Sequence, residues 1–361
     1  MSLRRLVIPL ALVAAAPLAA QDPPRVREAE SVLRTLVESY GASGMESPVR
    51  DAIRTALPSW ARPEVDTAGN LVLSVGQGEP TVVFIAHMDE VGFRVRAVAE
   101  DGTLEVEPLG GLFLSLWEGR PALVHTGSAA VPGVFQPREP GAPEARQPPA
   151  LRVDLGSGTR AGIEALGIRP GHTVTSPKEY VRLAGFRATG RAFDDRIGCA
   201  AQILAVRRLD PTRLRHTVVF VWSTREEIGL EGARAAARGL GIRPARVHAV
   251  DTFVSADSPL ERQGFAVAPL GRGPVARALD NSSVTPPALL DSLAALARAR
   301  GIPLQIGTTN GGNDGSVFGE YGVPGVPLAW PLRYSHSPVE VADLRDVVAL
   351  AELVRVVAEG W

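Results

Sequence analysis

Short apolar runs and amphipathic segments alternate along most of the chain. Runs of β-branched and aromatic residues predict strands at 70–76, 81–87, 216–224, 245–253 and 323–330. Apolar residues that recur every three or four positions predict helices at 26–40, 47–57, 198–209, 229–240, 286–300 and 341–358. This alternation is typical of a layered α/β domain, with a central mixed sheet flanked by helices.

The interval 94–182 departs from this rhythm. It contains short strand-like runs separated by Gly and Pro, and its stretch 137–149 is too rich in Pro and charge to be other than a loop. We therefore predict a small β-barrel-like domain at 94–182, inserted between two parts of the α/β domain at 22–93 and 183–361.

The N-terminus has the pattern of a secretory signal peptide. Arg4 and Arg5 precede an apolar stretch and a run of small residues that ends at Ala20. The apolar stretch is shorter than the roughly 20 residues that a membrane span needs, so a membrane anchor is the weaker interpretation. We predict that residues 1–20 are removed and that the mature protein, without a membrane span, is exported to the periplasm or secreted.

Composition narrows the range of partners and metal ligands. Lys and Arg number 38 against 39 Asp and Glu, which gives no reason to expect binding to nucleic acid or to an anionic membrane. Cys199 is the one cysteine, so the chain has neither an internal disulfide nor a cysteine-based zinc site. It lies in an apolar helical pattern and is expected to be buried. Any metal must then be held by His and carboxylate side chains.

Polar residues with metal-binding potential follow several predicted strands. His87 and Asp89 close one strand, and their spacing puts both side chains on one face. Glu226 and Glu227 stand side by side after another strand. Each feature also has an ordinary explanation, because a solvated strand end accommodates His-x-Asp or paired glutamates equally well.

Four more residues occupy similar places. Asp194 and Asp195 precede a helix, where one aspartate would serve as an N-cap. Asp251 ends a strand and His336 follows one. In open α/β sheets, ligands bind outside the carboxyl ends of the strands. Two histidines and three carboxylates at that edge can coordinate two divalent cations, which leaves one glutamate free as a base.

The order and content of nine motifs resemble the tetrahedral aminopeptidases, a family of dinuclear metallopeptidases that includes glutamyl and deblocking aminopeptidases. The similarity extends along nearly the whole mature chain. The motifs are GASGMESPVR, DTAGNLVLSVG, AHMDEVGF, VDLGSGTRAGIEALGIRPG, RAFDDRIGC, STREEIGLEGA, AVDTF, LGRGP and LRYSHSPVE.

The resemblance implies a role for each candidate residue. It assigns His87 and Asp251 to one metal, Glu227 and His336 to the other, and Asp194 to both. It makes Glu226 the general base, puts Asp89 behind His87, and leaves Asp195 as a neighbour. It also implies a zinc-exopeptidase fold, a dimerisation domain in the insertion, and a homodimer or larger assembly up to a dodecamer.

The implied activity is removal of N-terminal residues from peptide substrates by a water shared between two metal ions. Zinc suits the ligands best, and cobalt or manganese also fits. A dinuclear carboxypeptidase or an N-acyl amino acid deacylase is the nearest alternative. A scaffold that has lost activity should lack ligands that are present here, and a glycosidase would leave His87 and His336 without a role. Arg225 stands where the family usually has Gln, and NGGNDGSVF (310–318) departs from the family pattern near the substrate.

Overall fold

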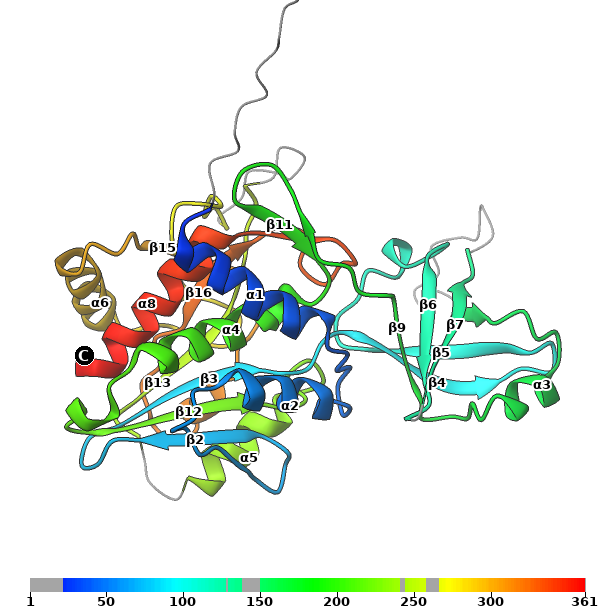
Figure 1. The fold of residues 1–361 in the computed structure, drawn as a ribbon, viewed down its shortest axis with the longest axis horizontal. Coiled ribbons are helices and arrows are strands. Elements are labelled where there is room, and N and C mark those ends of the chain that lie inside the picture. The colour runs from blue at the N-terminus through cyan, green and yellow to red at the C-terminus, as the bar shows by residue number, and fades with distance from the viewer. Residues whose placement is uncertain (1–21, 128, 138–149, 241–243, 258–265, 361) are drawn as a thin grey trace, which may run out of the picture.

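A mixed eight-stranded sheet forms the centre of the larger part of the molecule (Figure 1). The computed structural model describes residues 22–127, 129–137, 150–240, 244–257 and 266–360. The sheet order is β1-β2-β12-β3-β13-β16-β14-β15. These strands are β1 (Glu64–Val65), β2 (Leu71–Val75), β3 (Thr81–His87), β12 (Thr217–Ser223), β13 (Arg246–Val254), β14 (Val275–Leu279), β15 (Gln305–Thr308) and β16 (Leu328–Leu332). The mixed α/β sheet predicted from the sequence is confirmed.

The four central strands, β12, β3, β13 and β16, run parallel. Every residue of β3 is buried, as expected for a strand covered on both faces. Val82 and Phe84 pack in the cluster on one face of the sheet, whereas Val83 and Ile85 pack in the cluster on the other. The period-2 alternation of side chains therefore feeds two apolar cores from one strand.

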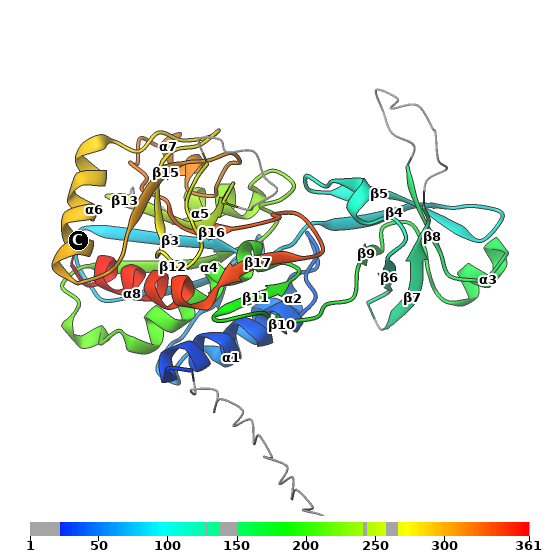
Figure 2. The same ribbon diagram turned by 90° about the horizontal axis from the view of Figure 1, so that it is seen from above.

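Helices form a layer on each face of the sheet (Figure 2). One layer contains α1 (Pro24–Glu38), α4 (Phe193–Arg208) and α8 (Leu344–Gly360), which pack on one another. The other contains α5 (Glu231–Gly239) and the short α7 (Ser316–Gly319). The remaining helices and short 3-10 turns are α2 (Ser47–Ala56), α6 (Pro287–Ala299), η2 (Pro211–Arg213), and, in the insertion, η1 (Leu114–Leu116) and α3 (Arg160–Ala165).

The segment after β3 forms a closed six-stranded barrel that projects from the α/β body (Figure 1). Its aromatic core packs Phe93, Trp117 and Phe135 with ring centroids 5.1–5.8 Å apart. The strands are β4 (Gly92–Val98), β5 (Thr103–Leu109), β6 (Pro121–His125), β7 (Ala130–Phe135), β8 (Leu151–Asp154) and β9 (Thr173–Thr175). The barrel keeps its own hydrophobic core, separate from those of the sheet.

A small sheet joins the end of the insertion to the C-terminal part of the chain. It pairs β10 (Val181–Arg182) with β11 (Arg187–Gly190), and β11 with β17 (Glu340–Asp343). The sequence pattern placed 341–358 in one helix, but α8 begins only at Leu344 because the preceding residues form β17. Pairing with β11, which is distant in sequence, overrides the local helical pattern there.

Other departures from the sequence pattern also have physical reasons. The strand expected at 323–330 starts only at Leu328, because Pro324 and Pro327 lack the N–H groups that a ladder needs. Within the described residues, no helix is long and apolar enough to span a membrane. The predicted signal segment, 1–20, lies outside the described residues, as do residues 138–149 of the predicted loop.

Candidate metal centre

The parallel strands at the centre of the sheet bring four of the five predicted ligands to one edge. His87 is the last residue of β3, Asp251 lies near the end of β13, and Glu227 follows β12. His336 lies in the turn after β16. Asp194, at the start of α4, completes the group. Because the strands are parallel neighbours, their carboxyl ends meet at the same edge of the sheet.

Asp194 lies between the two histidines. Its Oδ1 is 3.3 Å from Nε2 of His87, and its Oδ2 is 3.6 Å from Nε2 of His336. Nε2 of His336 is also 3.4 Å from Oε2 of Glu227. Each oxygen of Asp194 thus faces a different imidazole, which is the arrangement required of a carboxylate that bridges two cations.

The donor atoms lie close enough together to hold metal. Within the part of the chain that the structure describes, three sets of side chains each place their donor atoms within 4.8 Å of one another. The sets are His87–Asp194–Asp251, Asp194–Glu227–His336 and His87–Glu226–Glu227. The first two are the predicted ligand sets, with Asp194 in both. Glu226, the predicted base, lies beside the same ligands.

The charge balance of the centre also suits divalent cations. Burial raises the pKa of both the Glu226 and the Glu227 carboxyl well above their usual range, and nearby carboxylates raise it further. Oε1 of Glu227 is buried and has no hydrogen-bond partner within the described structure. Bound cations would offset the repulsion among these carboxylates and give that oxygen a partner.

Asp89 organises the centre from behind the ligands. Nδ1 of His87 lies 3.2 Å from the backbone carbonyl of Asp89 and 3.4 Å from its Oδ1, and these contacts orient the ring so that Nε2 faces Asp194. Oδ1 and Oδ2 also accept the backbone N–H groups of Glu226 and Glu227, at 3.0 and 3.2 Å. The hydroxyl of Ser43 donates to Oδ2 at 2.6 Å. Asp89 therefore positions the predicted base and one predicted ligand of each metal.

The turn after β12 positions the two glutamates. Arg225 has a positive φ of 54°, so the chain reverses immediately before Glu226. The Arg225 N–H donates to Oε1 of Glu46 at 3.1 Å, and the Gly44 N–H donates to the same oxygen at 2.7 Å. The Arg225 guanidinium pairs with Glu231 at 3.3 Å, and both side chains are largely exposed. Arg225 therefore contributes to the site through its backbone, which shapes the turn before Glu226, and its charged group pairs with Glu231 at the surface.

Two carboxylates hold the backbone of Asp194 and its surroundings. Asp195 is fully buried and accepts the backbone N–H of His87 at 2.9 Å and that of Gly198 at 3.0 Å. Asp195 lies beside the ligands, and the Asp194–Asp195 peptide bond is cis. Glu340 accepts the N–H groups of Asp194 and His336 at 3.2 and 2.9 Å. Burial raises the pKa of the Glu340 carboxyl to about 8.

Sequence reasoning missed Glu340, Arg277 and Asp314. Arg277 pairs with Asp251 at 3.3 Å, and Asp314 accepts a hydrogen bond from Ser223. Burial raises the pKa of the Asp314 carboxyl to about 7. Glu340 stands four residues after His336, in the SHSPVE motif, which was a detectable signal. Arg277 lies on β14, a strand that the hydrophobic pattern did not predict, so nothing in the sequence indicated it.

A cavity of about 310 Å³ opens beside the predicted ligands. It is lined by those ligands, by Glu226, by residues at the end of β13 and by the loop 310–312. Phe113 of the inserted barrel domain also lines it. The carbonyl of Gly111 accepts a hydrogen bond from Nδ1 of His336 at 2.6 Å. The insertion therefore contributes both to the cavity wall and to the orientation of a predicted ligand.

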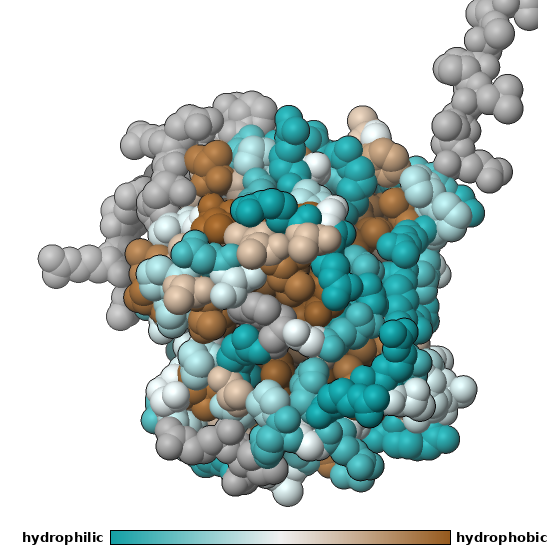
Figure 3. Space-filling model, turned by 90° about the vertical axis from the view of Figure 1, so that its left-hand side faces the viewer, coloured by the Kyte–Doolittle hydropathy of each residue, from teal (hydrophilic) through white to brown (hydrophobic). Residues whose placement is uncertain are grey.

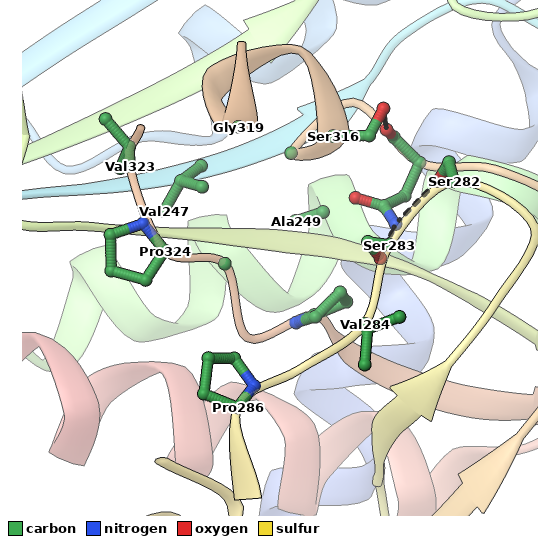
Figure 4. A pocket seen from close by; sticks show the side chains of 14 residues that line it. Val247, Ala249, Ser282, Ser283, Val284, Pro286, Ser316, Gly319, Val323 and Pro324 are labelled. Carbon is green, nitrogen blue, oxygen red and sulfur yellow. Dashed lines mark hydrogen bonds between the residues drawn. The ribbon is translucent and has the colours of Figure 1, made fainter. Parts of the chain in front are cut away.

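A second cavity lies further along the sheet, between α7, β13 and the segment 282–286 that leads from β14 to α6 (Figure 4). Val247, Ala249, Val284 and Pro286 contribute to its wall. Its described lining holds no histidine, cysteine or carboxylate. This cavity therefore lacks the side chains that the metal centre provides.

The side chains of Cys199, His248 and His125 have structural roles. Cys199 is buried, as predicted, and its thiol contacts the carbonyl of His87 at 3.1 Å. His248 is buried in β13, where Nδ1 bonds the carbonyl of Val326 at 2.9 Å and burial lowers its pKa to about 4. His125 bonds Thr175 at 2.8 Å in the barrel.

Similarity to known proteins extends over nearly the whole chain. The model of the M42 glutamyl aminopeptidase family matches residues 69–353. The lysyl aminopeptidase of Pyrococcus furiosus is 32% identical over 91% of this chain and 96% of its own. An aminopeptidase structure from Desulfurococcus kamchatkensis has a TM-score of 0.86 at 28% identity, covering 93% of this chain and 96% of its own.

A structure of the Pyrococcus horikoshii TET1 peptidase, described as assembling into a tetrahedron or a large octahedral shell, superposes with a TM-score of 0.83. Its sequence is 31% identical, and the match covers 92% of this chain and 100% of the P. horikoshii chain. These matches confirm the family resemblance found in the sequence motifs. The chain therefore belongs to the M42 glutamyl aminopeptidase family and is a peptidase.

Proposed function

We propose that this protein is an aminopeptidase that uses two divalent metal ions to remove N-terminal residues from peptides. The observation that carries the proposal is the position of Asp194, whose two oxygens face His87 and His336 separately. One set of ligands would be His87, Asp194 and Asp251, and the other Asp194, Glu227 and His336. Zinc suits these side chains best, and cobalt or manganese also fits.

Bound divalent cations would lower the pKa of water toward 7 and polarise the scissile carbonyl. Glu226 would act as the general base. Its carboxyl lies beside both ligand sets, so it can take the proton of the attacking water and pass it to the leaving amine. Asp89 fixes the backbone of Glu226 and the ring of His87, so the base and a ligand keep a constant relation during this transfer.

We also propose a homo-oligomer, from a homodimer to a dodecamer. The P. horikoshii relative can assemble into a tetrahedron or a large octahedral shell. This chain exposes apolar side chains near the free edge of its sheet, including Leu279, Val284 and Ile306. The end of the molecule that carries α6 shows hydrophobic residues among hydrophilic ones (Figure 3). The signal-peptide pattern of residues 1–20 supports export of the mature chain to the periplasm or beyond it.

The test is an assay of the mature protein on aminoacyl-p-nitroanilides and on their N-acetylated counterparts. We expect cleavage only of substrates with a free amine, loss of activity after chelation, and recovery on addition of zinc or cobalt. Cleavage that needs the acetyl group would identify a deacylase. Release of C-terminal residues from unblocked peptides would identify a carboxypeptidase. Either result would overturn the proposal.

A further inference from the structure

Outside the predicted ligands and base, the described wall of the metal-site cavity carries one charged side chain. The remaining wall consists of Phe113, Ser335, Thr252 and Val254 at the end of β13, and the loop 310–312. The single charged group is Arg277. Whether the cavity can bind a charged substrate side chain therefore depends first on whether Arg277 is free to pair with it.

Arg277 is already engaged in building the wall. Its side chain is 2% exposed, and its guanidinium lies 3.3 Å from Asp251 and 3.1 Å from Asp280. One terminal nitrogen donates to the carbonyl of Gly312 at 2.8 Å, and the other donates to the carbonyl of Thr252. Arg277 thus ties the loop 310–312 to the end of β13, and Asp280, which is outside the predicted ligand sets, neutralises its charge.

This arrangement disfavours a charged substrate side chain of either sign. An acidic side chain would have to compete with Asp251 and Asp280 for Arg277, at a buried site where an unpaired charge is costly. A basic side chain would need a carboxylate, and every carboxylate on the described wall belongs to the ligands or to Glu226. Those carboxylates would be neutralised by the cations.

The uncharged part of the wall offers apolar surface instead. Val254 is partly exposed into the cavity, and Phe113 is 64% exposed at the side formed by the insertion. An apolar side chain that covers these groups removes apolar area from water at about 25 cal/mol per Å². Phe113 also offers an aromatic face for an aromatic residue.

We propose that this enzyme prefers uncharged apolar N-terminal residues, aliphatic or aromatic, and that Val254, Phe113 and the neutralised Arg277 set this preference. The inference rests on the proposed aminopeptidase function. The family is named for a glutamyl aminopeptidase, and one relative is a lysyl aminopeptidase. Within its described residues, the cavity wall of this chain provides no free partner for an acidic or a basic substrate side chain.

The experiment measures kcat/KM of the mature, metal-loaded protein for Leu-, Phe-, Glu- and Lys-p-nitroanilide. We expect Leu or Phe to exceed both Glu and Lys at least tenfold. A Glu or Lys substrate that is cleaved best, or equal rates for all four, would overturn the preference and leave the aminopeptidase function standing. Failure to cleave any free-amine substrate would overturn the proposed function itself.

Charge variants at Val254 test where the preference originates, with Val254→Leu as the matched control. Val254→Lys should raise the Glu-to-Leu ratio of kcat/KM at least tenfold, and Val254→Glu should raise the Lys-to-Leu ratio similarly. Val254→Leu should leave both ratios within about threefold of wild type. Metal content and melting temperature identify variants that misfold. Unchanged ratios in folded, metal-loaded charge variants would remove Val254 from the substrate site.

Discussion

Glu226 and Glu227 are adjacent in sequence but have different surroundings. Both carboxylates line the cavity and belong to the set around His87. Glu227 also lies 3.4 Å from the His336 imidazole and belongs to the Asp194–His336 set, which does not include Glu226 among the described residues. Asp89 accepts both of their backbone N–H groups. Adjacent residues can therefore serve as a ligand and a base, because Asp89 fixes both backbones while only Glu227 of the pair joins the Asp194–His336 set.

Glu226→Gln should keep both metals and lower kcat by about 10²- to 10⁴-fold, the usual contribution of a general base. Glu227→Gln should instead lower the metal content toward one ion per chain. Metal analysis of the dialysed proteins, together with steady-state kinetics, distinguishes the two. Near wild-type turnover by Glu226→Gln would show that another group takes the proton.

At the scale of elements, the turn between β12 and α5 depends on a segment from the N-terminal part of the chain. Glu46 is 5% exposed and stands immediately before α2, and its Oε1 accepts the N–H groups of Gly44 and Arg225. Arg225 adopts a left-handed conformation, which a non-glycine residue keeps only when its surroundings hold it there. Glu46 is therefore a positioning residue for the turn that carries Glu226.

Glu46→Ala should lower kcat at least tenfold with little change in metal content, because two backbone N–H groups lose their acceptor and the turn loosens. Glu46→Gln should stay within about threefold of wild type, since the amide keeps an oxygen at the same place. Arg225→Gly should be tolerated, because glycine adopts positive φ without strain. Equal loss in Glu46→Gln and Glu46→Ala would show that the turn needs the charge rather than the acceptor.

At the scale of the whole molecule, the buried His248 links stability to pH. Burial in the sheet lowers its pKa to about 4, against about 6.5 in an unfolded chain. Between these values the unfolded state binds a proton that the folded state does not. Stability from this group is therefore fully present above about pH 6.5 and is lost progressively as the pH falls toward 4.

Between pH 7.5 and pH 5, the metal-free wild type should lose about 2 kcal/mol of unfolding free energy more than His248→Phe loses. Denaturant unfolding at the two pH values measures the difference. The experiment compares how the unfolding free energy of each protein changes with pH. A loss of packing energy in His248→Phe that is the same at both pH values therefore cancels. An identical pH dependence in the two proteins would show that His248 has the same pKa in the folded and unfolded states.

The sequence alone determined the fold class, most of the central elements and the family. Long apolar runs such as 81–87 and amphipathic segments such as 198–209 form locally consistent strands and helices, so their pattern sufficed. The candidate residues lie in such strands near their carboxyl ends or in the turns after them, and their motifs could be recognised from the sequence; they are His87, Glu226, Glu227, Asp251 and His336.

Tertiary structure alone decided what surrounds these residues. The strands β14, β15 and β17 are short and owe their form to pairing with distant segments, so no local period indicated them. Arg277 and Glu46 reach the centre across long stretches of chain, as Glu340 does in its contact with Asp194. These hydrogen bonds and ion pairs exist only after those segments pack. A sequence pattern indicates which face of a helix or strand a residue occupies. The residue that it contacts on a neighbouring element is determined by the fold.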